Sequence, residues 1–193
     1  MFQVILFFVI LIFSIVIHEY SHGYAAYKLG DPTAKNMGRL TLNPIAHIDI
    51  FGSILVPLLM YMTTGYVFGW AKPVPYNPYF LRNQKYGPAM VAVAGPLANL
   101  ILALVFGILF HFLALEGFTL IVLINIILAV FNLVPIPPLD GSKILFALIP
   151  DKYNHIKMAF EKFGFIVLLF FIFFAFDLIW PIINFLYKLV LFR

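Results

Sequence analysis

Long runs of apolar residues alternate with short polar segments along this chain, and the lengths of the runs match the thickness of a lipid bilayer. A helix of about 20 apolar residues crosses the hydrocarbon core of a membrane. Four runs of roughly this length predict membrane-spanning helices: residues 2–29, 89–115, 118–134 and 163–192. Asp177 and Pro181 interrupt the last run, which therefore forms either one kinked helix or two shorter pieces.

A fifth apolar run, residues 51–62, is too short for a full crossing of about 20 residues. Residues 65–78 follow it and are rich in glycine, proline and aromatic residues, which is typical of extended or turning chain rather than helix. We therefore expect an all-α polytopic membrane protein with about four to six transmembrane or membrane-embedded helices. We also expect a small extended or re-entrant β element near residues 65–78.

The composition supports a chain dissolved in lipid. Hydrophobic residues make up 64% of the 193 residues and charged residues only 10%, whereas soluble domains carry about 25% charged residues. One membrane domain over residues 1–193 uses the whole chain and leaves no room for a soluble domain of ordinary size. The absence of cysteine excludes disulfides and thiolate metal ligands.

The net charge of +4 marks cytoplasmic loops rather than a nucleic-acid site, because no basic cluster is dense enough to follow a phosphate backbone. Basic residues follow the first run, from Lys28 to Arg39, and the third, from Lys143 to Lys162. The positive-inside rule puts these two regions in the cytoplasm, and the N-terminus and the turn at Glu116 outside. With no basic residue before Lys28 and no small-residue cleavage site, the first run predicts a retained span rather than a signal peptide.

A metal-binding pattern lies near the end of the first run, where His18-Glu19-Tyr20-Ser21-His22 forms an H-E-x-x-H motif. Two histidines four residues apart project from one side of a helix, so both imidazoles can hold one Zn²⁺ while Glu19 acts on a nearby water. His18 precedes Lys28 by roughly 15 Å of helix, which puts the site below the cytoplasmic surface. Such a site has to face the protein interior or a water-filled cavity.

A catalytic zinc site commonly has three protein ligands. The remaining acidic and histidine candidates are Asp31, His47, Asp49, His111, Glu116, Asp140, Asp151, His155, Glu161 and Asp177. Asp140 has the best context, because three prolines among residues 135–138 break the helix and Gly141 permits a turn. Unwound backbone at membrane depth has to be buried in protein or beside water, where a carboxylate can reach a metal.

These motifs resemble the site-2 protease family of intramembrane zinc metalloproteases. The resemblance rests on the H-E-x-x-H motif, on N-x-x-P-x-x-P-L-D-G at residues 132–141, and on Ala-Gly-Pro-Leu-Ala-Asn at residues 94–99. It implies that His18, His22 and Asp140 bind Zn²⁺, that Glu19 is the general base, and that Asn132 helps to hold the substrate or the oxyanion. It also implies cleavage of membrane-spanning protein substrates by a multi-pass protein of the cell membrane. Many members add a PDZ or CBS domain, for which this chain has no length.

The topology agrees with this assignment. If residues 89–115 and 118–134 are the only full crossings between the motif and Asp140, both lie on the cytoplasmic side. Residues 51–78 then have to dip into the membrane and return, or lie along its interface. The resembling family often places a β-ribbon there, and such an edge could pair with an unwound substrate segment.

Several other readings stay open at this stage. The leading alternative function is a multi-pass transporter or metal carrier that uses the same ligands without hydrolysis, and another is a silent scaffold that binds membrane helices. The motif could be a buried polar cluster, and Asp140 and Asn132 could cap a turn and a helix. Gly95, Pro96 and Asn99 could serve close helix packing alone or support the metal site.

Overall fold

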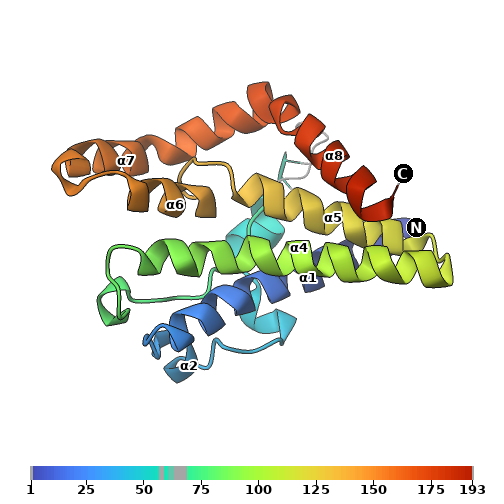
Figure 1. Ribbon diagram of the computed structural model, residues 1–193, viewed down its shortest axis with the longest axis horizontal. Helices are drawn as coiled ribbons and strands as arrows, with labels where there is room; N and C mark the ends of the chain where they lie inside the picture. Colours follow the sequence, from blue (N-terminus) through green and yellow to red (C-terminus); the bar gives the residue numbers. More distant parts are fainter. Residues whose placement is uncertain (1, 57–58, 61, 63–68, 193) are drawn as a thin grey trace.

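The computed structural model describes residues 2–56, 59–60, 62 and 69–192. Helix α4 (Gly87–Leu113) forms the centre of the bundle, and α1 (Phe2–Lys28) and α5 (Gly117–Asn132) pack against it. Figure 1 shows α4 and α5 as antiparallel neighbours joined by a short turn. Each of these helices coincides with a predicted apolar run, because such a run satisfies its backbone only as a helix in lipid.

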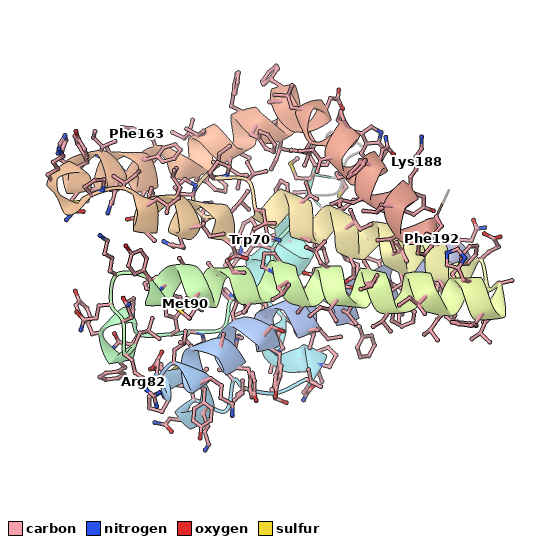
Figure 2. The ribbon with its side chains drawn as sticks, in the orientation of Figure 1. Trp70, Arg82, Met90, Phe163, Lys188 and Phe192 are labelled. Carbon is pink, nitrogen blue, oxygen red and sulfur yellow. The ribbon has the colours of Figure 1, made fainter. Side chains whose placement is uncertain are left out.

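Three segments of the described chain are long and apolar enough to cross a membrane: Gln3–Lys28, Gly87–Leu113 and Asn154–Leu178. Helices α5 and α8 (Trp180–Leu191) are apolar but shorter. Many large apolar side chains point outward, such as Phe112 and Phe174, which are 81% and 77% exposed. Figure 2 shows Phe163 on the outer side of its helix. Such surfaces suit lipid contact, so the protein is a membrane protein built from helices.

The chain between α1 and α4 is irregular. It contains α2 (Thr33–Asn36), the 3₁₀ turns η1 (Pro44–His47) and η3 (Pro78–Phe80), and the π-helical turn η2 (Ile50–Leu55). The Lys72 N–H donates to the His47 carbonyl at 2.9 Å, and the Trp70 N–H donates to the Gly52 carbonyl at 3.0 Å. Residues 47–52 and residues 70–72 therefore lie side by side.

The predicted β element is not found in residues 69–78, the part of residues 65–78 that the structure describes. Residues 65–68 lie outside the described residues. The described part is irregular up to residue 77, and Pro73, Pro75 and Pro78 explain why it forms no ladder there. Proline has no N–H to donate, so three prolines within six residues remove three donors that a sheet would need.

The last apolar run forms two helical pieces. Helix α7 starts at Asn154, ahead of the predicted residue 163, and ends at Phe170; η5 (Phe171–Ala175) and η6 (Phe176–Leu178) then lead into α8. Pro181 lies in the first turn of α8, where a missing N–H costs little. The two pieces form a bent arm beside α5, with the N- and C-termini at the same end of the molecule (Figure 1).

The main apolar core lies where α4 and α5 pack against the bent arm formed by the last apolar run. Its buried members are Ala103, Val122, Ile126, Val130, Phe171, Ile179, Ile183 and Leu191. A second, smaller cluster of Ala26, Leu81 and Val91 lies where α1 meets the start of α4. Between these two clusters α1 and α4 face each other through polar side chains.

Candidate metal centre

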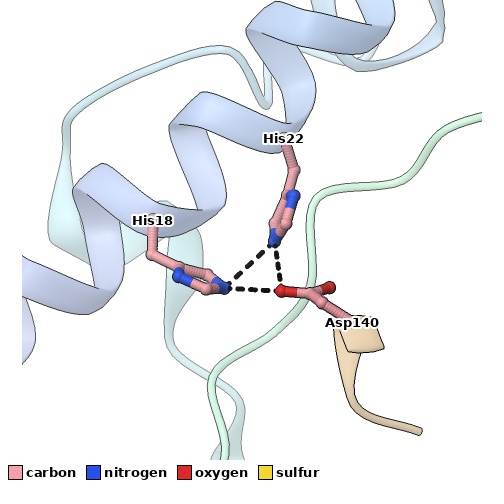
Figure 3. Close-up of side chains that lie close together, drawn as sticks. All are labelled: His18, His22 and Asp140. Atoms are coloured by element: carbon pink, nitrogen blue, oxygen red, sulfur yellow. Dashed lines mark hydrogen bonds and ion pairs between the residues drawn. The ribbon is translucent and has the colours of Figure 1, made fainter. Parts of the chain in front are cut away.

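His18 and His22 of α1 meet Asp140, the first residue of α6 (Asp140–Leu148), at one point (Figure 3). The Asp140 Oδ2 atom lies 3.2 Å from His18 Nε2 and 3.1 Å from His22 Nε2. The two Nε2 atoms are 3.0 Å apart. Helical spacing explains the histidine pair, whereas the aspartate comes from more than a hundred residues further along the chain.

Gly141 lets α6 begin close to the end of α5. A Cβ atom at this position would collide with the Leu133 carbonyl oxygen and would lie 2.5 Å from the Val134 carbonyl oxygen. Leu139 is extended, with ψ of 156°, so the helix starts anew at Asp140 after the proline-rich break. The break and the close approach together set the position of the Asp140 carboxylate.

Gly95 provides the space for the two imidazoles. A Cβ atom on Gly95 would lie 2.5 Å from His22 Nε2 and 2.7 Å from His18 Cε1, well inside van der Waals contact. Residues 91, 95 and 99 form one stripe of α4, because they are four residues apart. This stripe faces the stripe of α1 at residues 14, 18 and 22, and the two helices run antiparallel (Figure 1).

The partners of the Nδ1 atoms define the tautomers of both histidines. His22 Nδ1 lies 2.8 Å from the Val91 carbonyl oxygen, which can only accept, so His22 carries its proton on Nδ1. His18 Nδ1 lies 2.6 Å from Asn99 Oδ1, which is likewise an acceptor. In both neutral rings Nε2 is therefore a bare lone pair pointing toward Asp140.

This arrangement fits a small divalent cation. Two ring lone pairs and a carboxylate oxygen converge, and the buried Asp140 Oδ2 has no hydrogen-bond donor. Four tetrahedral ligands at about 2.0–2.1 Å from a zinc ion lie about 3.3 Å from one another, close to the three separations observed here. The two-nitrogen, one-oxygen donor set suits zinc and leaves one coordination position open.

Two pKa values near the centre are shifted. Burial acts to raise the pKa of the Asp140 carboxyl, but hydrogen bonds and positive charge from His18 and His22 lower it when the imidazoles are protonated. Burial raises the pKa of the Tyr76 phenol, and the negative charges of Asp140 and Glu161 add to the effect. The Tyr76 phenol is therefore neutral.

Glu19 is held by the extended segment that precedes η3. Its Oε2 atom accepts from the Val74 N–H at 2.8 Å. The Val74 side chain is buried against Gly23, where a Cβ atom would lie 2.7 Å from Val74 Cγ1. The same segment is fixed further on by the Asn77 N–H, which donates to the buried Asp31 at 2.6 Å. Residues 69–77 thus lie beside the candidate base.

Asn132 is the predicted site residue that the described contacts do not bring to the ligands. It ends α5, and its Nδ2 donates to the Leu128 carbonyl one turn back, at 2.9 Å. Other candidates are occupied elsewhere: His47 pairs with the Thr41 carbonyl, His111 packs on Phe192, and Asp31 accepts from Thr33. The role of Asn132 stays a prediction.

Sequence reasoning missed Ser14 and Asn125, which lie beside Asn99 behind His18 and are almost fully buried. Ser14 is four residues before His18, so helical spacing alone put it on the metal-facing stripe. Asn125 is an amide in the middle of the apolar run 118–134, and a polar residue inside a span is a functional signal by default. Both signals were present in the sequence.

Comparison with known proteins gives one family. The model of Peptidase family M50 matches residues 6–118 and 111–175. The putative zinc metalloprotease YwhC of Bacillus subtilis is 40% identical over 192 residues, covering 90% of this chain and 84% of that protein. The putative zinc metalloprotease Rip2 of Mycolicibacterium smegmatis is 31% identical over 135 residues, covering 66% and 51%. Zinc metalloprotease MJ0392 of Methanocaldococcus jannaschii is 28% identical over 155 residues, covering 78% and 36%. No solved structure matches the chain.

Proposed function

Because this chain belongs to peptidase family M50, the site-2 protease family, we propose that it cleaves peptide bonds within membrane-spanning segments of other proteins. His18, His22 and Asp140 are the zinc ligands in this proposal, and Glu19 is the general base. Intramembrane zinc metalloproteolysis is the function of the family. The cleavage activity of this chain and the role of each residue are what we propose.

One observation carries the proposal. His18 Nε2, His22 Nε2 and Asp140 Oδ2 lie within 3.0–3.2 Å of one another, although they come from α1 and from the first residue of α6. A purely structural polar cluster would place donors opposite acceptors. Here three acceptors face one another, and only a proton or a cation between them makes that arrangement stable.

The residues of the chain divide the chemistry as follows. Zinc, when bound, supplies a Lewis acid that lowers the pKa of water and polarises a carbonyl. Glu19 accepts the proton of the attacking water and delivers it to the leaving amine. The Val74 N–H holds one carboxylate oxygen of Glu19, which fixes the orientation of the group while its other oxygen stays available. Asn132 has a second amide N–H, which we assign to the substrate or the oxyanion.

A membrane-spanning substrate has to unwind before it is cut, because helical hydrogen bonds hide its carbonyl groups. Residues 69–77 lie beside Glu19, so an unwound substrate segment that reaches the candidate base would pass along them. The alternative of a transporter or metal carrier has no support from the relatives reported above, which are all named as zinc metalloproteases.

Metal removal tests the proposed reaction. We expect the purified protein in detergent to cleave a reporter membrane span, and a chelator to reduce cleavage to background, because all three candidate ligands serve the cation. Added Zn²⁺ should restore cleavage, whereas Mg²⁺ should not, since Mg²⁺ prefers octahedral oxygen ligands. Cleavage that persists after verified removal of the metal would exclude the proposal.

We further propose that this chain is a multi-pass protein of the cell membrane and that its metal centre lies toward the cytoplasm. The loop after α1 and the stretch from α6 to α7 lie at one end of the molecule and carry most of the lysines (Figure 1). The turn at Glu116 lies at the opposite end. The positive-inside rule assigns the lysine-bearing end to the cytoplasm.

Cysteine labelling tests this orientation directly, because the chain has no native cysteine. In intact cells, a membrane-impermeant maleimide should label a Glu116→Cys variant and should leave a Lys35→Cys variant unlabelled until the membrane is opened. Both positions are outside the proposed catalytic machinery. The reverse labelling pattern would invert the proposed topology and move the metal centre to the outer side.

A further inference from the structure

Three polar side chains form a buried network behind His18. Asn99 and Asn125 are 0% exposed and Ser14 is 3% exposed. They come from α4, α5 and α1, so the network lies where these three helices meet. A buried amide that lacks partners destabilises the fold, and this penalty disappears only when its donors and acceptors are paired. The contacts of the network show that both amides are paired.

The directions of these hydrogen bonds are fixed by groups that can only accept. Asn99 Nδ2 donates to the Ser14 backbone carbonyl at 3.3 Å and to Asn125 Oδ1 at 2.8 Å. Asn125 Nδ2 donates to the Ile121 carbonyl and to Ser14 Oγ, each at 2.9 Å. A carbonyl oxygen has no proton to give, so neither amide can be turned over without losing a bond.

The fixed orientation of Asn99 determines the state of His18. With Nδ2 committed to Ser14 and Asn125, Asn99 presents only Oδ1 to the imidazole, and the 2.6 Å contact requires His18 to donate from Nδ1. His22 receives the same constraint from the backbone carbonyl of Val91, which no substitution removes. Of the two histidines, only His18 depends on a side chain that can be changed.

We propose that Asn99, itself held by Asn125 and Ser14, is a positioning residue that fixes the tautomer and ring plane of His18 for metal binding. The inference rests on the proposed function of this centre and deepens it. Asn99 is not one of the three candidate ligands and acts through His18. Partners behind a metal-ligating histidine commonly set metal affinity by about 10- to 100-fold.

A competing role for the same residues is adhesion between helices. Interhelical amide pairs stabilise membrane bundles with no connection to a metal. That role requires only the bonds among Ser14, Asn99 and Asn125. Adhesion alone does not explain the short hydrogen bond between Asn99 and His18. It also predicts that any two substitutions that destabilise the bundle equally weaken zinc binding equally.

The test measures zinc affinity by chelator competition for the whole purified chain in detergent. We expect Asn99→Leu to weaken zinc binding by about 10- to 100-fold. Asn99→Ala is a second variant that cannot overpack the site, and we expect the same direction of change. Ile126→Ala is the matched control, because Ile126 is a fully buried neighbour of Asn125 in α5 and belongs to the apolar core. The control should lower thermal stability and leave zinc affinity within about threefold of the native value, because no partner of a ligand is removed.

A second readout reports on His18 itself. In ¹⁵N-histidine spectra of the zinc-loaded protein, the Nδ1 proton of His18 should resonate downfield and exchange slowly with solvent. Asn99→Leu and Asn99→Ala should remove both properties, whereas Ile126→Ala should keep them. Helix adhesion alone does not move this signal, because it does not involve Nδ1.

Three results would overturn the inference: native zinc affinity in the Asn99 variants, an unchanged Nδ1 proton in them, or an equal loss of affinity in Ile126→Ala. Neither readout requires a substrate. A native chain that binds zinc with a protected Nδ1 proton but cleaves no membrane span would refute the proposed proteolysis alone. Full proteolysis and zinc affinity in Asn99→Leu would refute the positioning role alone.

Discussion

Glu19→Gln should abolish cleavage of a membrane-spanning reporter while leaving zinc bound. A general base contributes about 10²- to 10⁴-fold to a rate, and a loss of 10³-fold corresponds to about 4 kcal/mol of transition-state stabilisation. The glutamine cannot take a proton from water, yet its side-chain oxygen can still accept the Val74 N–H. The substitution therefore removes the chemistry and keeps the contact with residues 69–77.

The measurement is the single-turnover cleavage rate with zinc content determined on the same sample. Glu116→Gln provides a matched control, because Glu116 lies in the turn before α5 at the other end of the molecule, and we expect it to cleave at the native rate. A Glu19→Gln protein that holds zinc and cleaves at the native rate would remove Glu19 from the mechanism. A Glu19→Gln protein that has lost zinc would instead assign Glu19 to metal binding.

Gly95→Ala should empty the metal centre. The added methyl carbon would lie 2.5 Å from His22 Nε2 and 2.7 Å from His18 Cε1, so both rings would have to leave the positions that converge on Asp140. Because a cation needs all three ligands at about 2.0–2.2 Å, we expect zinc affinity to fall by at least 100-fold, or about 2.7 kcal/mol, and cleavage to fall with it.

The control uses the same substitution in the same helix. Gly107 also lies in α4, but a Cβ atom there would meet Val190 of α8 instead of an imidazole. Gly107→Ala should lower the melting temperature and retain zinc. Equal zinc affinity in the Gly95→Ala and native proteins would contradict this prediction. It would show that the imidazoles of His18 and His22 can move away from the added methyl group and still bind the metal.

The proposed centre also explains why irregular chain flanks it. Backbone outside helices is tolerated at membrane depth only where protein or water satisfies it. The break at residues 133–139 is buried at Pro137 and Leu139, and residues 69–77 are fixed through Glu19 and Asp31. Both irregular segments therefore border the candidate centre, where protein groups pair much of their backbone.

Several features were predictable because they depend on local order along the chain. Apolar length determined α1, α4 and α5, since lipid allows no other conformation for such runs. Four-residue spacing determined that His18 and His22 share a face. Prolines and Gly141 determined the break that carries Asp140. The same proline rule, applied to Pro73, Pro75 and Pro78, argues against the β element that we expected near residues 65–78.

Other features depend on how helices are rotated and shifted against each other, which no local pattern records. The sequence by itself indicated the candidate ligands and the helix face that His18 and His22 share. Only the tertiary structure decided that Val91 and Asn99 face the two imidazoles, that Gly95 leaves room between them, and that Val74 holds Glu19. The physical reason lies in helix geometry. If the pairing of α1 with α4 changed by one residue, the facing side chains would move by about 1.5 Å along the axis and about 100° around it, whereas nothing within either helix would change.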